Sequence, residues 1–144
     1  MPKSPPLQVL GWREWAALPG LGLSRIAAKL DTGARSSAIH VEHLECRGDG
    51  TDEIAHFVLR DAEGHDIEAS APVIDRRNVK SSSGHSHRRV FIRTLLLLGG
   101  QTFEIELNLT QRHGLSHAML IGRSALAGRF LVDPESAWLA GELP

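Results

Sequence analysis

The fold of this chain is decided by residues 27–38, which read Ala27-Ala28-Lys29-Leu30-Asp31-Thr32-Gly33-Ala34-Arg35-Ser36-Ser37-Ala38. The first half of the stretch is mostly apolar and predicts a strand. The second half predicts a sharp turn that carries one carboxylate, because Asp hydrogen-bonds nearby backbone and Gly accepts angles that other residues avoid. Such a turn holds a carboxylate in one fixed direction, which catalysis requires.

A second motif lies 91 residues after Asp31, where Gly122 is preceded by two apolar residues and followed by Arg123. The segment reads Leu120-Ile121-Gly122-Arg123-Ser124-Ala125-Leu126. Together with Leu30-Asp31-Thr32-Gly33-Ala34, it resembles the active-site signatures of the aspartic proteases, the retropepsin group above all. The triplet Asp-Thr-Gly alone has an alternative interpretation, an ordinary turn with a solvated Asp, so the conjunction of the two motifs carries the resemblance.

The sequence of residues 29–38 and 129–134 resembles that of a narrower bacterial family. Members of that family carry the label ATP-dependent zinc protease and are often encoded beside ATP-grasp amino-acid ligases of the RimK type. The likeness extends from about Gly11 to Leu139.

Length and composition favour one soluble globular domain covering residues 1–144, with residues 1–6 as a disordered tail. The chain has 144 residues, of which 42% are hydrophobic and 23% charged, enough for one domain with a real core. Its net charge of −1 gives no general attraction to nucleic acid or anionic membranes. Met1 to Pro6 lacks the apolar core of a signal peptide, and no apolar run is long enough to cross a bilayer. We therefore expect a cytoplasmic protein without nucleic-acid or membrane partners.

Short strand patterns separated by turn residues dominate the rest of the chain. The clearest is a hairpin in which residues 90–98 and 101–110 flank Gly99-Gly100, and its second arm alternates apolar and polar residues with a period of two. Residues 54–59 and 67–74 predict another hairpin. Further strands are expected at 7–10, 25–30, 37–46, 119–121 and 129–132, with one helical turn at 123–127.

This pattern predicts an all-β fold, a barrel or sandwich. The resemblance to retropepsins implies the same class: a small closed barrel with one short helix.

The resemblance implies peptide hydrolysis by Asp31. An aspartic protease needs two carboxylates about 3 Å apart, which share one proton and activate a water between them. This chain has one Asp-Thr-Gly, and the other aspartates lack that setting. The mechanism therefore demands a homodimer in which the two copies of Asp31 meet near a two-fold axis. By the same resemblance, Thr32, Gly33 and Ala34 form the active-site loop.

Gly122 and Arg123 are expected to support that loop from beneath, with a structural salt bridge as the favoured role of Arg123. Arg35 stands where viral retropepsins commonly carry an acidic residue, and its guanidinium suits a carboxylate of the substrate. We therefore predict a peptide or protein substrate with acidic or glutamate-modified residues. A solvated, outward-facing Arg35 is equally compatible with the sequence.

Ser83, Gly84 and His85 are the remaining candidates for substrate binding. They lie in a Gly/Ser-rich segment, residues 81–93, beside Arg76, Arg77 and Lys80. The segment suits either a mobile cover over a cleft or a plain solvated loop, and the loop is slightly favoured.

Two alternative functions stay open. In the first, a metal-dependent peptidase uses His85 and His87, which would face one way on a strand, with His113 or His117 as a third ligand. A full ligand set cannot be assembled from spacing, and no phosphate-binding loop is present, so no metal and no cofactor are predicted. In the second, a non-catalytic β-barrel module binds acidic peptides through Arg35 and residues 76–93.

Overall fold

Strands make up most of the computed structural model, which describes residues 6–80, 83–111 and 117–144. The predicted N-terminal tail falls mainly on residues 1–5, outside the described residues. In chain order the elements are β1 (Gln8–Gly11), β2 (Arg13–Leu18), η1 (Pro19–Leu21), β3 (Leu23–Asp31), β4 (Ser37–His40), β5 (Glu42–Arg47), η2 (Gly50–Asp52), β6 (Ile54–Arg60), β7 (Asp66–Pro72), β8 (Asp75–Lys80), β9 (Ser86–Leu98), β10 (Gln101–Thr110), β11 (Met119–Gly122), α1 (Arg123–Leu126) and β12 (Phe130–Asp133).

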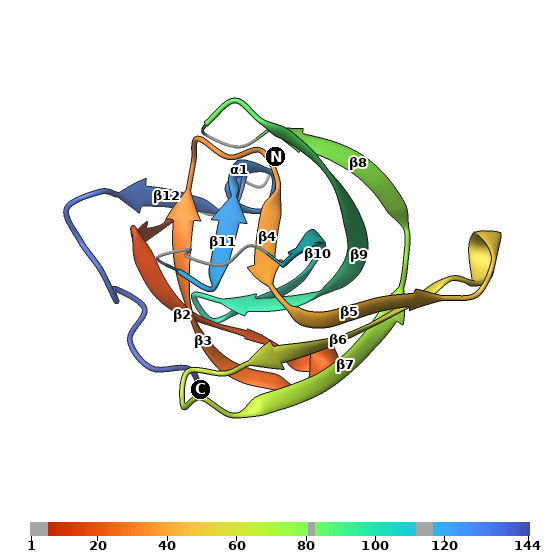
Figure 1. Cartoon of the computed structure of the whole chain (residues 1–144). Coiled ribbons are helices and arrows are strands. Elements are labelled where there is room, and N and C mark those ends of the chain that lie inside the picture. The colour runs from red at the N-terminus through yellow and green to blue at the C-terminus, as the bar shows by residue number, and fades with distance from the viewer. Residues whose placement is uncertain (1–5, 81–82, 112–116) are drawn as a thin grey trace, which may run out of the picture.

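The main sheet closes on itself. Its strands run in the order β10-β4-β11-β3-β2-β9-β8, and β9 also pairs with β10. The closing contact between β2 and β9 is short, Ala16 with Leu98 and Ala17 with Leu97, whereas the β9–β10 hairpin pairs along nearly its full length. Figure 1 shows the resulting barrel, with β8 lying outside it along β9. The predicted all-β class with one short helix is confirmed.

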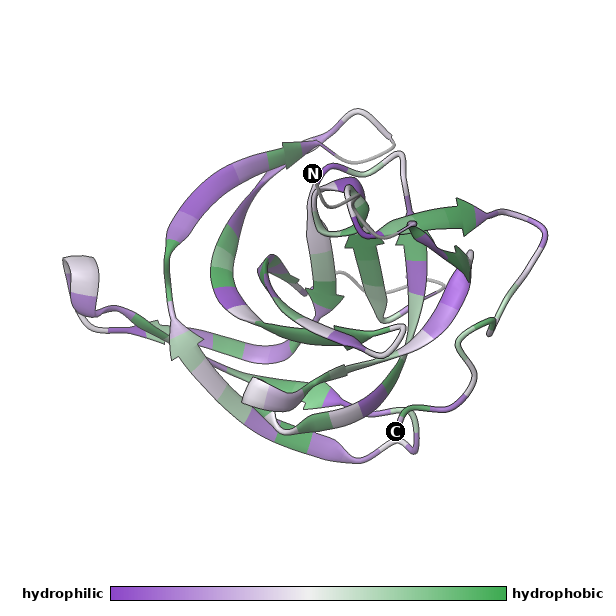
Figure 2. Ribbon diagram, turned by 180° about the vertical axis from the view of Figure 1, so that it is seen from behind, coloured by the Kyte–Doolittle hydropathy of each residue, from purple (hydrophilic) through white to green (hydrophobic). Residues whose placement is uncertain are grey.

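The barrel encloses one apolar cluster. Leu10, Leu23, Ile92, Leu107 and Ile121 are among its fully buried members, and Figure 2 shows hydrophobic residues alternating with polar ones along the curved strands. A three-stranded sheet, β5-β6-β7, contributes Ala55, Phe57 and Leu59 to the same cluster. The barrel and this sheet therefore share a core.

The predicted hairpins are confirmed, with one difference on β10. Phe103, Ile105, Leu107 and Leu109 are buried as the alternation predicts. Asn108, which alternation places on the open face, is also buried, because β4 covers that end of β10 and the Asn108 amide donates to the Ser37 carbonyl oxygen.

Three strand predictions need correction. Residues 37–46 form two strands, β4 and β5, rather than one, because the chain changes sheets at Val41 and His43 adopts a positive φ of 54°. β2 and β8 were not predicted. Glu14 and a run of alanines make β2 a poor strand by propensity, and β8 is polar on both faces, as suits an edge strand.

A separate two-stranded sheet joins the ends of the described chain. β1 and β12 pair in parallel, with Val9 beside Leu131, and both side chains are about half exposed (49% and 53%). After β12 the chain returns across β2, where Trp138 stacks on Trp15. No helix in the described residues is long and apolar enough to cross a membrane.

Candidate active site

Two parallel strands bring the sequence motifs together. β3 and β11 are neighbours, with Leu30 beside Ile121 and Asp31 beside Gly122. Because parallel strands end at the same edge of a sheet, the Asp-Thr-Gly turn and α1 begin side by side. Asp31 itself is half-buried, while Thr32 and Gly33 are exposed.

Backbone hydrogen bonds orient the Asp31 carboxylate. The Gly33 N–H donates to Asp31 Oδ1 at 3.0 Å, and the Ala34 N–H donates to the Asp31 carbonyl oxygen at 3.1 Å. A Cβ on Gly33 would lie 3.3 Å from Asp31 Oδ1, so glycine leaves the space around the carboxylate open. The turn thus holds one carboxylate oxygen by a donor and presents the half-buried group at the surface.

The start of α1 supports the turn from the side of β11. The Arg123 N–H donates to the Ala34 carbonyl oxygen at 2.8 Å, and the Ser124 N–H to that of Arg35 at 3.2 Å. A Cβ on Gly122 would lie 2.6 Å from the Ser36 backbone, which is closer than real contacts allow. Only glycine therefore lets β11 approach the loop this closely.

Arg123 supports the loop in a different way from the predicted salt bridge. Its Nη1 donates to the Gly33 carbonyl oxygen at 3.3 Å, with the Thr32 carbonyl oxygen at 3.5 Å. Across the described ranges no carboxylate pairs with it. The guanidinium therefore contacts backbone carbonyl groups of the turn instead of a carboxylate.

Two buried polar residues that sequence reasoning missed complete the support. Ser37 Oγ accepts a hydrogen bond from the Gly122 N–H at 3.1 Å. Asn108 Nδ2 donates to the Ser37 carbonyl oxygen at 2.9 Å. Both are buried, and together they connect β10, β4 and β11 beneath the loop. Alternation along residues 101–110 places Asn108 on the open face, so no local signal in the sequence identifies these two residues.

Arg35 follows the turn and is exposed. In the part of the chain that the structure describes, its side chain has no hydrogen bond or ion pair. The guanidinium is therefore available to a ligand, and its role stays a prediction.

Ser83, Gly84 and His85 lie at the tip of the hairpin formed by β8 and β9, and all three are exposed. This hairpin tip and the Asp31 turn lie at the same end of the molecule in both ribbon views (Figures 1 and 2). The favoured loop for residues 81–93 is wrong from Ser86 onward, where β9 begins. Ser81 and Ser82 lie outside the described residues.

The arginines near this hairpin are occupied by carboxylates of the chain itself. Arg76 makes two hydrogen bonds of 2.6 Å to Glu53, and Arg77 binds Asp75 and Glu106 at 2.7 Å each. The guanidinium of Arg77 lowers the pKa of Glu106 below its ordinary value. Arg76 and Arg77 thus link β8 to other parts of the chain. Their guanidinium groups bind carboxylates of the chain itself instead of the predicted acidic peptide.

Among the described residues, no group of side chains could serve as the zinc ligands of the alternative metal-dependent peptidase. His85 precedes β9 rather than lying on it, and His87 is an exposed residue of β9. His117 lies against Trp12 instead, with ring centroids 5.6 Å apart. His113 lies outside the described residues, and elsewhere no three His, Cys, Asp or Glu side chains gather to hold a metal.

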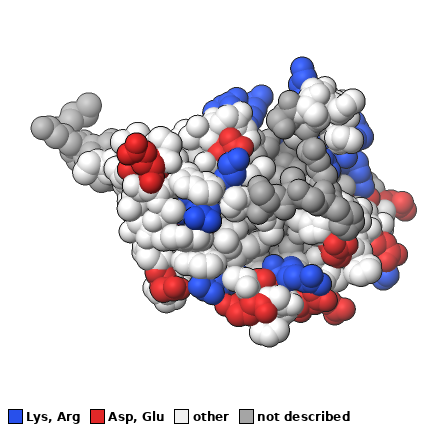
Figure 3. Space-filling view, turned by 60° about the vertical axis from the view of Figure 1, so that its left-hand side comes forward, with Lys and Arg blue, Asp and Glu red and all other residues white. Residues whose placement is uncertain are grey.

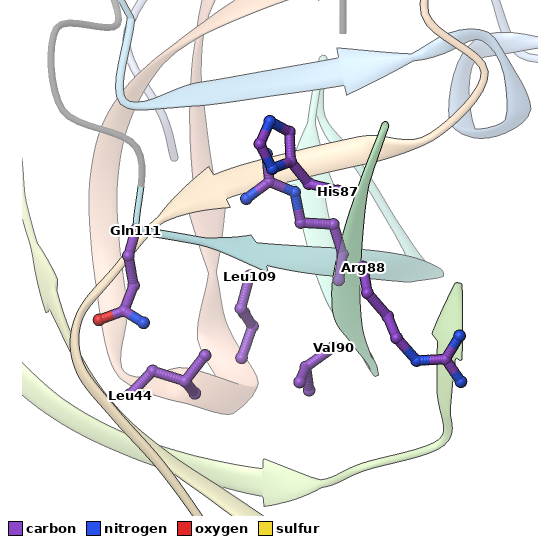
Figure 4. A pocket seen from close by; sticks show the side chains of 7 residues that line it. Leu44, His87, Arg88, Val90, Leu109 and Gln111 are labelled. Carbon is purple, nitrogen blue, oxygen red and sulfur yellow. The ribbon is translucent and has the colours of Figure 1, made fainter. Parts of the chain in front are cut away.

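A pocket of about 280 Å³ opens between β5 and the β9–β10 hairpin. Leu44, Val90 and Leu109 point toward one another across it, and His87 lies at its other end (Figure 4). None of its lining residues belongs to the Asp31 turn. Its walls are mixed, because Arg88, Arg89 and Gln111 line it together with the apolar side chains.

Comparison with solved structures supports the fold. A protein of unknown function from Legionella pneumophila, Lpg0085 (DUF785), has a TM-score of 0.76 over 92% of this chain and 98% of its own, at 23% identity. At that identity the likeness concerns the fold alone.

Curated relatives are longer proteins. A protein of Shewanella pealeana is 36% identical over 93% of this chain, and one of Parasynechococcus marenigrum is 38% identical over 94%. Both are named "Probable alpha-L-glutamate ligase". The chain spans about 30% of the length of each.

The family comparison covers nearly the whole chain. Residues 9–142 match the RimB-like family, described as "Retropepsin-like aspartic endopeptidase RimB". This range contains the Asp31 turn, its Gly122-Arg123 support and the strands that close the barrel. The chain belongs to the RimB-like family of retropepsin-like aspartic endopeptidases.

Proposed function

We propose that this protein is an aspartic peptidase that works as a homodimer and cleaves peptides rich in acidic residues. The observation that carries the proposal is the half-buried Asp31 carboxylate, held by the Gly33 N–H on a loop that β11 and α1 support. Family membership supports the reaction class.

The chemistry follows from two Asp31 side chains at a two-fold axis. Two carboxylates about 3 Å apart cannot both ionise cheaply, so they share a proton. The ionised carboxylate removes a proton from water as the water attacks the peptide carbonyl, and the protonated one polarises that carbonyl. Thr32 and Gly33 are exposed beside Asp31, which supports the proposed contacts with the partner's loop and the substrate backbone.

The β1–β12 sheet carries a candidate surface for binding a second copy of the chain. Leu7, Val9 and Leu131 are large apolar side chains exposed by 39%, 49% and 53% on or beside the β1–β12 sheet. Apolar side chains clustered on an open two-stranded sheet suit burial against another subunit. An isologous dimer would place the same patch on both sides of the axis.

Acidic substrates are proposed from the free guanidinium of Arg35 and from the relatives named as glutamate ligases. A guanidinium binds a carboxylate bidentately. Ser83, Gly84 and His85, at the tip of the β8–β9 hairpin, are the proposed contacts from the other side of the substrate.

The decisive experiment replaces Asp31 by Asn, which removes the titrating group with little change of shape. Hydrolysis of an acidic peptide is expected to fall by roughly 10²–10⁴-fold, with binding of that peptide retained. Asp66→Asn, an exposed aspartate of β7, is the control and should retain activity. Full activity of Asp31→Asn would overturn the proposal, and loss of that activity with a chelator would instead point to a metal.

A further inference from the structure

One face of the sheet places cationic residues in the row next to Asp31. Along β3, Lys29 and Asp31 point to the same side, about 7 Å apart along the strand. Arg13 of β2 lies opposite Lys29 on one side, and Leu120 of β11 lies beside it on the other. Any chain that lies against the Asp31 carboxylate on this face passes this row.

Arg13 is held there by aromatic rings. Its guanidinium carbon lies 4.4 Å from the Trp12 ring centroid and 5.2 Å from that of Trp138. Its Nε is buried and has no hydrogen-bond partner in the described part of the chain. Cation–π contact with these rings takes no hydrogen bond from the guanidinium, so its terminal N–H groups remain for a carboxylate.

His117 adds a third group to this cluster. Its ring packs edge-on against Trp12, and burial, followed by the charges of Arg13 and Lys29, lowers the pKa of His117 below its ordinary value. The three side chains are thus close enough to influence one another electrostatically.

This cluster differs from several other basic groups of the protein. Arg25, Arg76, Arg77 and Arg93 each pair with a carboxylate of the chain, whereas across the described ranges neither Arg13 nor Lys29 does. In Figure 3 the left-hand side of Figure 1 is turned toward the viewer. On this face most acidic side chains lie along the lower and right-hand edges of the picture. Like charges without a counter-ion repel each other, so the Arg13 and Lys29 side chains are stabilised when an anion lies beside them.

We propose that Arg13, Lys29 and His117 form a subsite that binds a carboxylate of the substrate residue next to the cleaved bond. This inference rests on the proposed peptidase function and adds residues that determine its specificity. The carboxylate comes either from a Glu or Asp side chain or from the free C-terminus of the peptide. Lys29 supplies a point charge, and Arg13 supplies the oriented N–H donors.

The test uses Lys29, because Arg13 also packs between two tryptophans and its loss would disturb the C-terminal segment. Three peptides are compared: acetylated and amidated tetraglutamate, its tetraglutamine analogue, and tetraglutamine with a free C-terminus. We expect Lys29→Met to reduce the glutamate-over-glutamine ratio of kcat/KM by about tenfold or more, and Lys29→Arg to retain most of it. The third peptide identifies the C-terminus as the source if it is preferred over the amidated tetraglutamine.

Arg60→Met is the control, since it removes one positive charge on β6, where Arg60 pairs with Asp66. A Lys29→Met protein in which both the glutamate-over-glutamine ratio and any preference for the free C-terminus are unchanged, or an equal drop in Arg60→Met, would overturn the subsite.

Binding to the Asp31→Asn protein separates this subsite from the peptidase proposal. Tetraglutamate should bind and raise the pKa of His117, measured by NMR, and Lys29→Met should weaken that binding by about tenfold or more. If no peptide is cleaved but this binding is seen, the peptidase proposal fails and the subsite stands. If neither tetraglutamate nor tetraglutamine with a free C-terminus binds better than amidated tetraglutamine, the subsite fails whatever the enzyme cleaves.

Discussion

At the scale of single residues, Gly122 is the position where the site depends most on a missing side chain. In Gly122→Ala the new Cβ would meet the Ser36 backbone at 2.6 Å, so β11 and the loop must separate. Overpacking of this kind costs about 1–3 kcal/mol, and peptidase activity should fall because the Asp31 turn shifts. Urea unfolding and peptide hydrolysis measure the two effects.

Gly20→Ala is the matched control for this change. Its new Cβ would approach only the Thr94 hydroxyl, at 3.3 Å, and its φ is not positive. A Gly122→Ala protein as stable and active as Gly20→Ala would contradict the proposed support of the loop.

His117 gives a prediction about pH. Its pKa is lowered in the folded protein by burial, Arg13 and Lys29, while the unfolded chain regains the ordinary value of about 6.5. Below that pH the unfolded chain binds more protons at His117 than the folded protein does. The free energy of unfolding therefore falls as the pH drops through this window. His117→Gln should flatten that slope relative to wild type, measured by urea unfolding between about pH 5 and 8.

Lys29→Met is a second variant to be compared with wild type by urea unfolding over the same pH range. Removing this cation should raise the pKa of His117 and reduce the slope in part. A slope unaffected by either substitution would contradict the electrostatic account of the cluster.

The residues of the two motifs were recognisable in the sequence, whereas the buried residues beneath them were not. Asp31, Thr32, Gly33, Gly122 and Arg123 are recognisable because each carries a local signature. Ser37 and Asn108 act only through contacts between distant strands, and Lys29 matters through its place in the row beside Asp31. Contacts between residues so far apart in the chain cannot be recognised from a local stretch of sequence.

At the scale of elements, the C-terminal segment is anchored to β2 by one carboxylate. Glu14 is fully buried and accepts the N–H groups of Gly11, Leu139 and Ala140 at 2.7, 2.9 and 3.1 Å. Glu14→Gln offers only one acceptor oxygen and should lower the free energy of unfolding by about 1.5–3 kcal/mol.

Glu68→Gln is the control, because Glu68 is an exposed carboxylate of β7 and its loss should be nearly neutral. Proteolysis of the C-terminal segment reports the same anchor, since Glu14→Gln should be cut there faster than wild type. Equal stability and equal proteolysis of the two variants would show that Glu14 does not hold the segment.

Elements with a regular period were predictable, and elements stabilised by tertiary contacts were not. The β9–β10 hairpin follows from strict alternation around Gly99-Gly100. β2 forms because buried Glu14 finds backbone donors in the C-terminal segment, and β8 forms because its arginines pair with Glu53 and Glu106. Neither reason is visible in a local window of sequence.

At the scale of the whole molecule, the closed sheet explains how one chain holds the Asp31 loop from several sides. β3 and β11 end together, and β4 and β10 fix the loop from behind. The pattern of short strands and turn residues predicted the all-β class. The order of the strands could not be predicted without the resemblance, because it depends on parallel pairings between segments more than 60 residues apart.

The central claim is that Asp31 works only beside a second Asp31. Its most direct measurement mixes wild-type and Asp31→Asn subunits, exchanged to equilibrium, and follows peptide hydrolysis as the wild-type fraction changes. If both carboxylates are needed, activity falls as the square of that fraction, to roughly a quarter at an equal mixture with total protein held constant. Activity that falls in direct proportion, to roughly a half, would mean that each subunit acts alone, and the account of a shared dyad would be wrong.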